Sequence, residues 1–128
     1  MKKILFDSDV LIEHLRGNSQ VTSQMNALYE SQNILAYTPV SEAEIFRGLR
    51  SNERQKTEAI LVHFECLDLN QLVGRKAGEY LKQYSRSHGL EIPDALIAAT
   101  ASIYRFHLCT FNWKHYPMRE VERFEMER

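Results

Sequence analysis

The sequence predicts an α/β protein of three-layer α/β/α architecture, in which helices cover both faces of a mainly parallel sheet of four or five strands. Two observations lead to this prediction. Short apolar runs alternate with segments of helical periodicity along the whole chain. These runs are continuous, which is typical of parallel strands buried on both faces. The 128 residues show no repeat or low-complexity linker, so we expect one domain spanning residues 1–128.

Four apolar segments are expected to form the strands of the sheet, and a short edge strand is expected to close it. In chain order these five segments are residues 4–6, 34–37, 66–69, 108–110 and 121–124. The second strand must stop at Thr38-Pro39, because proline lacks the N–H that a central strand needs.

The first four helices are marked by apolar residues at helical spacing. The first begins near Val10 and ends at Gly17, and Ser19 is expected to cap the second. The third leaves the second strand and ends near Gly48, and the fourth includes residues 60–64. The inner face of the third helix is expected to contain Val40, Ala43, Ile45, Phe46 and Leu49.

The last two helices have clear boundaries in the sequence. The longest should run from about residue 70 to residue 87, with Gly89 as its C-cap. Pro93 belongs in the first turn of the next helix, where its missing N–H is tolerated. The body of that helix, residues 95–101, is apolar nearly all round, so we expect it to be central and to approach the sheet closely through its alanines.

Composition narrows the class of protein. Sixteen basic and seventeen acidic residues give a net charge of −1, which excludes a basic protein that coats nucleic acid but allows an enzyme with a local basic rim. Cys66 and Cys109 are isolated in apolar segments, so we expect two buried thiols and no disulfide. The five histidines lack the spacing of a zinc site. We see no pattern of a signal peptide or a membrane span, and expect a soluble, cytoplasmic protein.

Acidic and amide side chains follow the predicted strands at the points where ligands bind in open α/β sheets. Asp7 and Asp9 come directly after the first strand, and Glu44 lies one turn into the helix that leaves the second. Asp94 lies in the first turn of the last helix, and Asn112 follows the fourth strand. A set of oxygen ligands suits Mg²⁺ or Mn²⁺ better than zinc.

Most of these side chains also have a purely structural explanation. Asp9 can cap the first helix, and Ser41 with Glu44 matches a capping box. An acid in the first turn of the last helix complements the helix dipole, and Asn112 is a common turn residue. Asp7 is harder to explain in this way, because a carboxylate at the end of a buried strand is costly without a cation or hydrogen-bond donors.

Four stretches of the chain resemble, in their order and spacing, those of PIN-domain ribonucleases, and specifically of VapC-type toxins from toxin–antitoxin pairs. These stretches are residues 5–12, 40–48, 92–101 and 108–112. The resemblance extends over essentially the whole chain. The resemblance implies a PIN-like fold and a metal-dependent endoribonuclease that hydrolyses RNA phosphodiester bonds as the toxin of a type II toxin–antitoxin system.

The resemblance also implies which acids carry the chemistry. Asp7, Glu44 and Asp94 correspond to the catalytic acids of the family and would bind Mg²⁺ or Mn²⁺. A fourth acid, which often occurs in the family, is replaced here by the neutral Asn112, which leaves the fourth ligand position open. His115 similarly stands where many relatives have an acid.

Other residues would support the reaction or bind partners. Ser8 and Thr110 could orient a ligand or water through their hydroxyls. A rim that binds RNA phosphates could be formed by Arg16, Arg47, Arg50 and Lys114. By the resemblance, the chain should form a homodimer and be held inactive by a VapB-like antitoxin. A groove for that partner could be formed by Leu11, Ile12, Leu15, Val21 and Phe46, unless these side chains pack inward.

Two other functions remain open at this point. Asp7 and Asp9 also fit the aspartyl nucleophile and second acid of a haloacid-dehalogenase-type phosphatase, although no matching lysine motif or later acidic pair is found. The neutral Asn112 favours a catalytically weak PIN-fold module that binds RNA or protein. Metal-dependent RNA cleavage that is lost in Asp7→Asn would separate the ribonuclease from the binding module.

Overall fold

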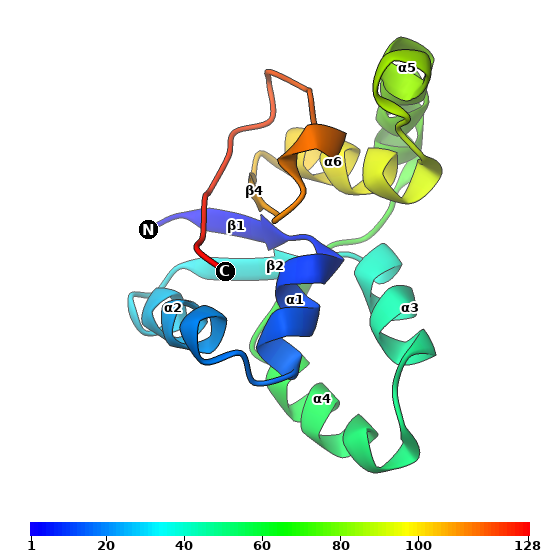
Figure 1. The fold of residues 1–128 in the computed structure, drawn as a ribbon. Helices are drawn as coiled ribbons and strands as arrows, with labels where there is room; N and C mark the ends of the chain where they lie inside the picture. Colours follow the sequence, from blue (N-terminus) through cyan, green and yellow to red (C-terminus); the bar gives the residue numbers. More distant parts are fainter.

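The computed structural model describes residues 1–128 and contains one sheet of four strands, all parallel to one another (Figure 1). The strands are β1 (Lys3–Phe6), β2 (Ile34–Tyr37), β3 (Glu65–Cys66) and β4 (His107–Cys109), in the spatial order β3-β2-β1-β4. In the centre of the sheet, Ile4 pairs with Leu35 on one side and with His107 on the other. The predicted α/β fold with a parallel sheet is confirmed.

Six helices cover this sheet. They are α1 (Ser8–Leu15), α2 (Ser19–Glu30), α3 (Pro39–Arg47), α4 (Arg54–Leu61), α5 (Gln71–His88) and α6 (Ile92–Tyr104). As expected, α5 ends at Gly89, whose φ of 62° is left-handed. The cap of α2 is Asn18 and not Ser19, because the Asn18 side-chain oxygen accepts the Val21 N–H at 3.1 Å. None of the six helices combines the length and the apolar character that crossing a membrane requires.

The expected edge strand at residues 121–124 is reduced to a single parallel bridge between Leu108 and Arg123. The pairing is short because the chain then leaves β4 and runs to α2. There the Glu127 N–H donates to Gln24 Oε1 at 3.1 Å. The last residues therefore connect the edge of the sheet to a helix instead of extending the sheet.

Three local predictions from the sequence are wrong. Cys66 is exposed, because β3 is an edge strand of only two residues. Ala43 is also exposed, and Ser41 takes the buried position on α3. Phe64 lies beyond the end of α4, in a turn where its N–H donates to the Leu61 carbonyl at 2.9 Å.

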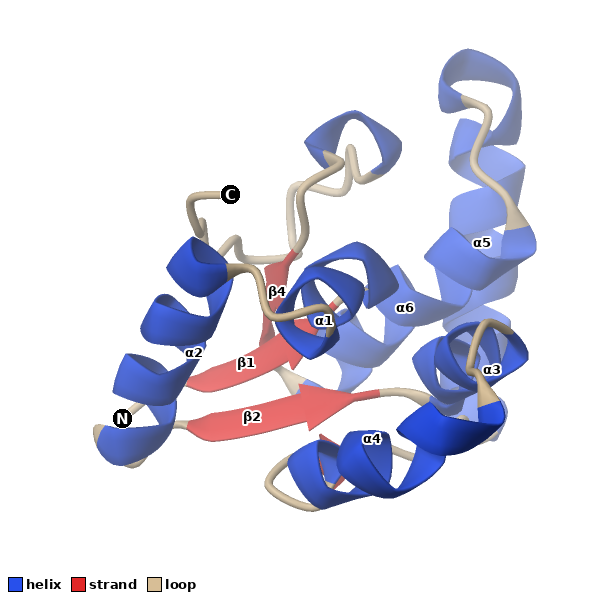
Figure 2. Cartoon of the chain, turned by 60° about the horizontal axis from the view of Figure 1, so that its bottom comes forward, coloured by secondary structure: helices blue, strands red, loops and turns tan.

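The alternation of side chains along the strands divides the core into two parts, one under each of the helix layers that Figures 1 and 2 show on the two faces of the sheet. Leu5, Ala36 and Leu108 pack in the core that includes buried residues of α5 and α6. The neighbouring strand residues, Phe6 and Leu35 among them, pack in the core that includes buried residues of α1, α2 and α4. Helix α3 contacts both α1 and α6. It therefore links the two layers at the carboxyl ends of the strands.

Candidate active site

The polar residues of the candidate site meet at the carboxyl ends of β1 and β4. Asp7 follows β1, and its N–H donates to the Cys109 carbonyl at 2.9 Å, which fixes it beside the end of β4. Asp7 is also the N-cap of α1, because its carboxylate accepts the Ser8 N–H at 2.7 Å. The strand order thus brings Asp7 next to Thr110, although they are far apart in the sequence.

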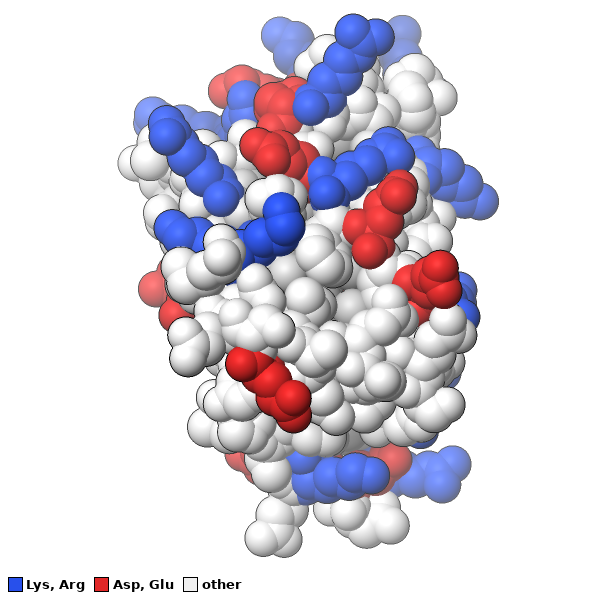
Figure 3. All heavy atoms as spheres, turned by 90° about the vertical axis from the view of Figure 1, so that its left-hand side faces the viewer, with Lys and Arg blue, Asp and Glu red and all other residues white.

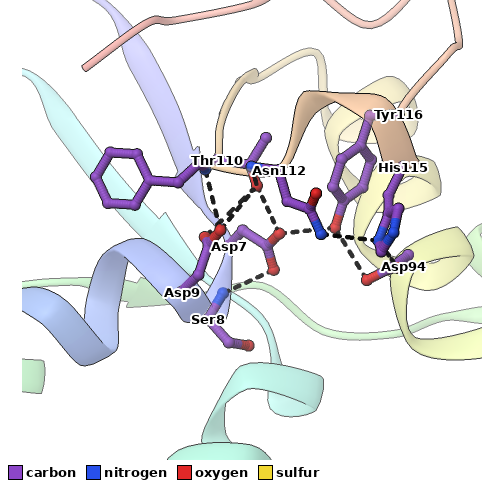
Figure 4. A network of polar contacts seen from close by, with 9 residues as sticks. Asp7, Ser8, Asp9, Asp94, Thr110, Asn112, His115 and Tyr116 are labelled. Atoms are coloured by element: carbon purple, nitrogen blue, oxygen red, sulfur yellow. Dashed lines mark hydrogen bonds and ion pairs between the residues drawn. The ribbon is translucent and has the colours of Figure 1, made fainter. Parts of the chain in front are cut away.

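Four acids lie at this site, namely Asp7, Asp9, Glu44 and Asp94. Asp7 is the most buried of them, with 8% of its surface exposed. Its Oδ2 accepts two hydroxyl hydrogen bonds, from Thr110 at 2.8 Å and from Tyr116 at 2.9 Å (Figure 4). Burial and the nearby charge of Asp9 raise the pKa of Asp7 to about 6, against the opposing effect of its hydrogen-bond donors. The site therefore holds a carboxylate that is desolvated but well supplied with donors.

Asp94 approaches from the first turn of α6 and is also held by the segment after β4. Its Oδ1 lies 3.2 Å from the Tyr116 hydroxyl, and its Oδ2 lies 3.2 Å from His115 Nδ1. Burial raises the pKa of Asp94, and the charge of Glu44 adds to this effect, whereas His115 and Tyr116 oppose it. The Tyr116 hydroxyl thus lies between the carboxyl groups of Asp7 and Asp94 (Figure 4).

Glu44 is connected to the same site through Ser8. Its Oε1 accepts the Ser8 hydroxyl at 2.7 Å, and that hydroxyl also lies 2.8 Å from Ser41 Oγ. The predicted capping box of Ser41 and Glu44 is wrong. The N-cap of α3 is Thr38, whose hydroxyl faces the Ser41 N–H at 3.5 Å, because Pro39 already occupies the first helical position. Glu44 is therefore beyond the first turn and free to face α1.

Asp9 has a structural role different from the predicted cap. Asp7 occupies the N-cap position of α1, and Asp9 accepts the Phe111 N–H at 3.0 Å. Its carboxylate also lies 3.4 Å from the Thr110 hydroxyl. Burial raises the pKa of Asp9, while the Phe111 N–H favours the ionised form. Asp9 thus ties the start of α1 to the turn after β4.

Asn112 reaches the site indirectly. Its Nδ2 lies 2.9 Å from His115 Nδ1, and its N–H donates to the Thr110 hydroxyl at 3.1 Å. The amide therefore contacts the histidine that holds Asp94, and it makes no hydrogen bond to any of the acids. Its role as a fourth ligand stays a prediction.

Tyr116 is a member of this site that reasoning from the sequence missed. The ring is 2% exposed, and the oxygen contacts two acids from different elements. Its position shortly after the fourth strand was the only available signal. Nothing in the local pattern indicates that a tyrosine at the end of a 3₁₀ turn, Trp113–His115, points its hydroxyl into an acidic cluster.

The donor set fits a hard divalent cation in its chemistry, since it consists of carboxylate and hydroxyl oxygens. The hydroxyls of Thr110 and Tyr116 join Asp7 to Asp9 and to Asp94, and Ser8 links Asp7 to Glu44 through its N–H and its hydroxyl. No three carboxylate, imidazole or thiol groups are arranged so that they could hold a metal directly. None of the four acids forms a salt bridge with a lysine or an arginine. The site thus gathers four acids whose contacts are hydrogen bonds and one histidine, with Arg128 near enough to Asp9 to oppose the rise of its pKa.

The four cations of the expected phosphate-binding rim are all exposed. Arg16 lines a cavity of about 140 Å³ together with Glu44, so this arginine is close to the candidate site. No hydrogen bond or salt bridge joins Arg47, Arg50 or Lys114 to the acids. On the face that contains α2, cationic side chains lie mainly at the margins, and uncharged atoms cover the middle (Figure 3).

Two of the five residues expected to form a groove pack inward, and a groove that binds the antitoxin stays a prediction. Leu11 and Val21 are fully buried and pack inward, so they cannot form a groove. Ile12 and Leu15 are half-buried and line the cavity beside Glu44. A larger cavity of about 430 Å³ lies between α1, α2 and α4. Its lining includes His14, Met25, Tyr29, Ala59, Ile60 and Phe64.

Comparisons with known proteins agree on one family. The model of the PIN domain family matches residues 4–121. Ribonuclease VapC10 of Mycobacterium tuberculosis is 39% identical over 120 residues, which cover 91% of this chain and 88% of that relative. Ribonuclease VapC19 of the same organism is 29% identical over 115 residues, covering 89% and 92% of the two chains.

The fold matches chains from two solved complexes. One is VapBC2 from Rickettsia felis bound to a promoter DNA fragment, with a TM-score of 0.81 at 19% identity, covering 98% of this chain and 99% of that chain. The other is DNA-bound VapBC from Salmonella typhimurium, with a TM-score of 0.82 at 14% identity and 98% coverage of both chains.

Proposed function

This chain belongs to the PIN domain family as a homologue of VapC ribonucleases, and we propose that it cleaves RNA with Mg²⁺ or Mn²⁺ held by Asp7, Glu44 and Asp94. One observation supports the metal site above all others. Four acids gather at one edge of the sheet, and no lysine or arginine is paired with any of them. The match to the PIN domain family also argues against the phosphatase alternative, in which Glu44 has no role.

The hydrogen bonds between these acids leave their charge incompletely balanced. Tyr116 has one hydroxyl hydrogen and two carboxylate neighbours, so it cannot donate to Asp7 and Asp94 at the same time. Burial raises the pKa of both acids, because ionised carboxylates away from water need a compensating charge. A divalent cation would supply that charge.

A bound divalent cation would activate water and stabilise the negative charge of a phosphodiester during hydrolysis. The side chains of the protein would prepare the site for this chemistry. Ser8 holds Glu44, Thr110 holds Asp7, and His115 holds Asp94. Arg16, which lines a cavity with Glu44, is the rim cation best placed to attract a phosphate.

Substitution of Asp94 tests this proposal. In Asp94→Asn, RNA cleavage in Mg²⁺ or Mn²⁺ should fall on the order of 10³-fold, because a charged ligand is lost. Cleavage by the wild type should also stop on chelation. Asp68→Asn is a matched control, since Asp68 is exposed and its side chain makes no hydrogen bond. Near-normal cleavage by Asp94→Asn would contradict the metal site, and a wild type that binds RNA without cleaving it would favour the binding module.

We also propose a VapB-like antitoxin as partner. The apolar cavity of about 430 Å³ between α1, α2 and α4 suits an amphipathic segment, and an arginine of that segment could pair with the unbalanced acids. The test is co-purification with the product of the adjacent small gene, followed by an RNase assay with and without it. Cleavage that the co-expressed protein does not reduce would contradict this partner.

Self-association is the remaining part of the proposal. Leu72 at the start of α5 and Ile92 at the start of α6 are about 60% exposed, as apolar side chains at an interface between two copies would be. Light scattering after gel filtration should give the mass of a dimer, and Leu72→Glu should shift it toward the monomer. A monomeric wild type at micromolar concentration would contradict the homodimer.

A further inference from the structure

The hydroxyl of Tyr116 is the one group that contacts both Asp7 and Asp94 through hydrogen bonds. We propose that Tyr116 is a positioning residue that competes with the divalent cation for these two carboxylates. The inference rests on the proposed function, because it takes Asp7 and Asp94 as ligands of the cation. It adds that the strength of cation binding is set partly by a side chain that is not itself an acid.

The position of this hydroxyl is fixed by packing. The Tyr116 ring is 2% exposed and belongs to the core on the α6 side of the sheet. Its N–H donates to the Trp113 carbonyl at 2.9 Å, which closes the 3₁₀ turn behind it. A buried ring in a closed turn cannot turn its oxygen to solvent without opening the core. The hydroxyl therefore keeps its position, and any change on cation binding has to come from the two carboxylates.

The distances explain why a hydroxyl and a cation are alternatives here. The Tyr116 oxygen lies 2.9 Å from Asp7 Oδ2 and 3.2 Å from Asp94 Oδ1, which are hydrogen-bond lengths. Two oxygens that bind one Mg²⁺ at about 2.1 Å each can be no more than about 4.2 Å apart. No three acidic side chains of the site are gathered around one point in this way. We infer that Asp7 and Asp94 must give up their contact with Tyr116, at least in part, to share a cation.

The effect of removing the hydroxyl follows from this competition. Tyr116→Phe removes the single hydroxyl hydrogen that the two carboxylates share in the cation-free protein, where a donor is most needed. In the cation-loaded protein the same oxygens are neutralised by the cation, so the loss is smaller. Thr110 and Ser8 differ in this respect, because neither contacts both Asp7 and Asp94. Tyr116→Phe should therefore destabilise the free protein and tighten cation binding.

The test is a titration of the purified protein with Mn²⁺ by isothermal calorimetry, together with thermal unfolding with and without Mn²⁺. For Tyr116→Phe we expect the Kd for Mn²⁺ to fall about tenfold. The melting temperature should fall without Mn²⁺ and should rise on its addition by more than that of the wild type. If the free variant is unfolded, added Mn²⁺ should restore the fold. A Kd that is unchanged or higher, or a variant that Mn²⁺ does not refold, would overturn the proposal.

Tyr80→Phe is a matched control for the loss of a buried tyrosine hydroxyl. Tyr80 is also 2% exposed, and its hydroxyl donates to the Glu120 carboxylate at 2.6 Å, outside the candidate site. This variant should lose stability but keep the wild-type Kd for Mn²⁺. A tightened Kd in Tyr80→Phe would show that general loosening of the fold is responsible, which also overturns the role of Tyr116.

A third variant separates this inference from the proposed function. Asp94→Asn should lose Mn²⁺ binding if the acids form the metal site. If the wild type binds Mn²⁺, Asp94→Asn does not, and Tyr116→Phe binds like the wild type, only the role of Tyr116 is wrong. If the wild type does not bind Mn²⁺ at millimolar concentration, the metal site itself is wrong and the inference is overturned with it.

Discussion

The two faces of the sheet are covered in different ways. On the α5–α6 face, 17 buried apolar residues form the core, and Ala95, Ala98 and Ala99 allow α6 to lie close to the strands. On the other face, 13 buried residues form the core, and a cavity of about 430 Å³ remains between the helices. The first face is closed by small side chains, and the second keeps a hollow that a partner could fill.

The sequences of the helices explain this difference. Helix α6 has six buried residues in 13, so it fits against the sheet along its length. Helix α2 has only two, Val21 and Met25, and α4 has only Thr57 and Leu61. Helix α5 on the closed face also buries only three residues in 18, so the close packing of that face comes from α6. The closed face is therefore the more tightly packed one, and the open face has the space that the proposed antitoxin would need.

The largest expected difference between the two faces is in the unfolding free energy that is lost when a buried leucine is replaced by alanine. Leu5 is fully buried on the closed face, whereas Leu35 on the neighbouring strand lines the existing cavity of the open face. Leu5→Ala should cost about 4 kcal/mol of unfolding free energy, and Leu35→Ala about 2 kcal/mol, because its space joins one that is already open. Urea denaturation of both variants measures this. Equal losses would contradict the comparison.

A second prediction concerns recognition on the open face. Ala59→Arg places a long cation at the edge of the cavity, where Ala59 is exposed in the free protein. The antitoxin should bind about 100-fold more weakly, which is ~2.7 kcal/mol, while RNA cleavage by the free protein stays unchanged. Calorimetry with the co-purified partner measures the affinity. The control is Gln83→Arg, which makes the same change of charge at an exposed position of α5. Weakened binding in the control alone would assign recognition to the closed face.

Asp7 provides a third test, at the edge where the two faces meet. Because burial raises its pKa from 3.8 to about 6, the folded protein binds more protons than the unfolded chain between these pH values. The stability of the cation-free protein should therefore decrease as pH rises through this window. Asp7→Asn should be more stable than the wild type by about 3 kcal/mol at pH 7, and the difference should vanish below about pH 3. A pH-independent difference in urea denaturation would show that burial of charge is not its cause.

The smallest expected effect is at the rim of the open face. Arg16→Ala should lower kcat/KM for RNA about fivefold at low salt, and less at high salt, because its attraction for phosphate is screened. Arg86→Ala is the control, since Arg86 is exposed on α5, which is part of the closed face. Equal effects of the two substitutions would show that kcat/KM depends only on the overall charge of the protein and not on the position of Arg16.

Much of the fold could be predicted because its signals are local. The strand at residues 34–37 coincides with β2, and Gly89 ends α5 as expected. The position of Asp7 could also be predicted, since a carboxylate after the first buried strand of a parallel sheet must lie at its carboxyl edge. These features depend on neighbours in the sequence or on the topology of the sheet.

The errors depend on competition between neighbours or on distant packing. Thr38-Pro39 both ends β2 and begins α3, so Thr38 takes the cap that Ser41 could have formed. Asp7 takes the cap of α1 from Asp9 in the same way. Tyr116 could not be predicted, because its hydroxyl meets Asp94 only after a 3₁₀ turn and α6 have packed on the same side of the sheet.

Helix α1 is a rigid element of eight residues, about 12 Å long, whose two ends have different roles. Its amino end holds Ser8 and Asp9 and is capped by Asp7, while Leu15 near its carboxyl end lines the cavity beside Glu44. Val10 and Leu11, which are fully buried, pack the middle of the helix into the core. The helix is thus held at its middle as one rigid unit. Its amino end, which carries residues of the acidic site, and Leu15 therefore keep a fixed separation.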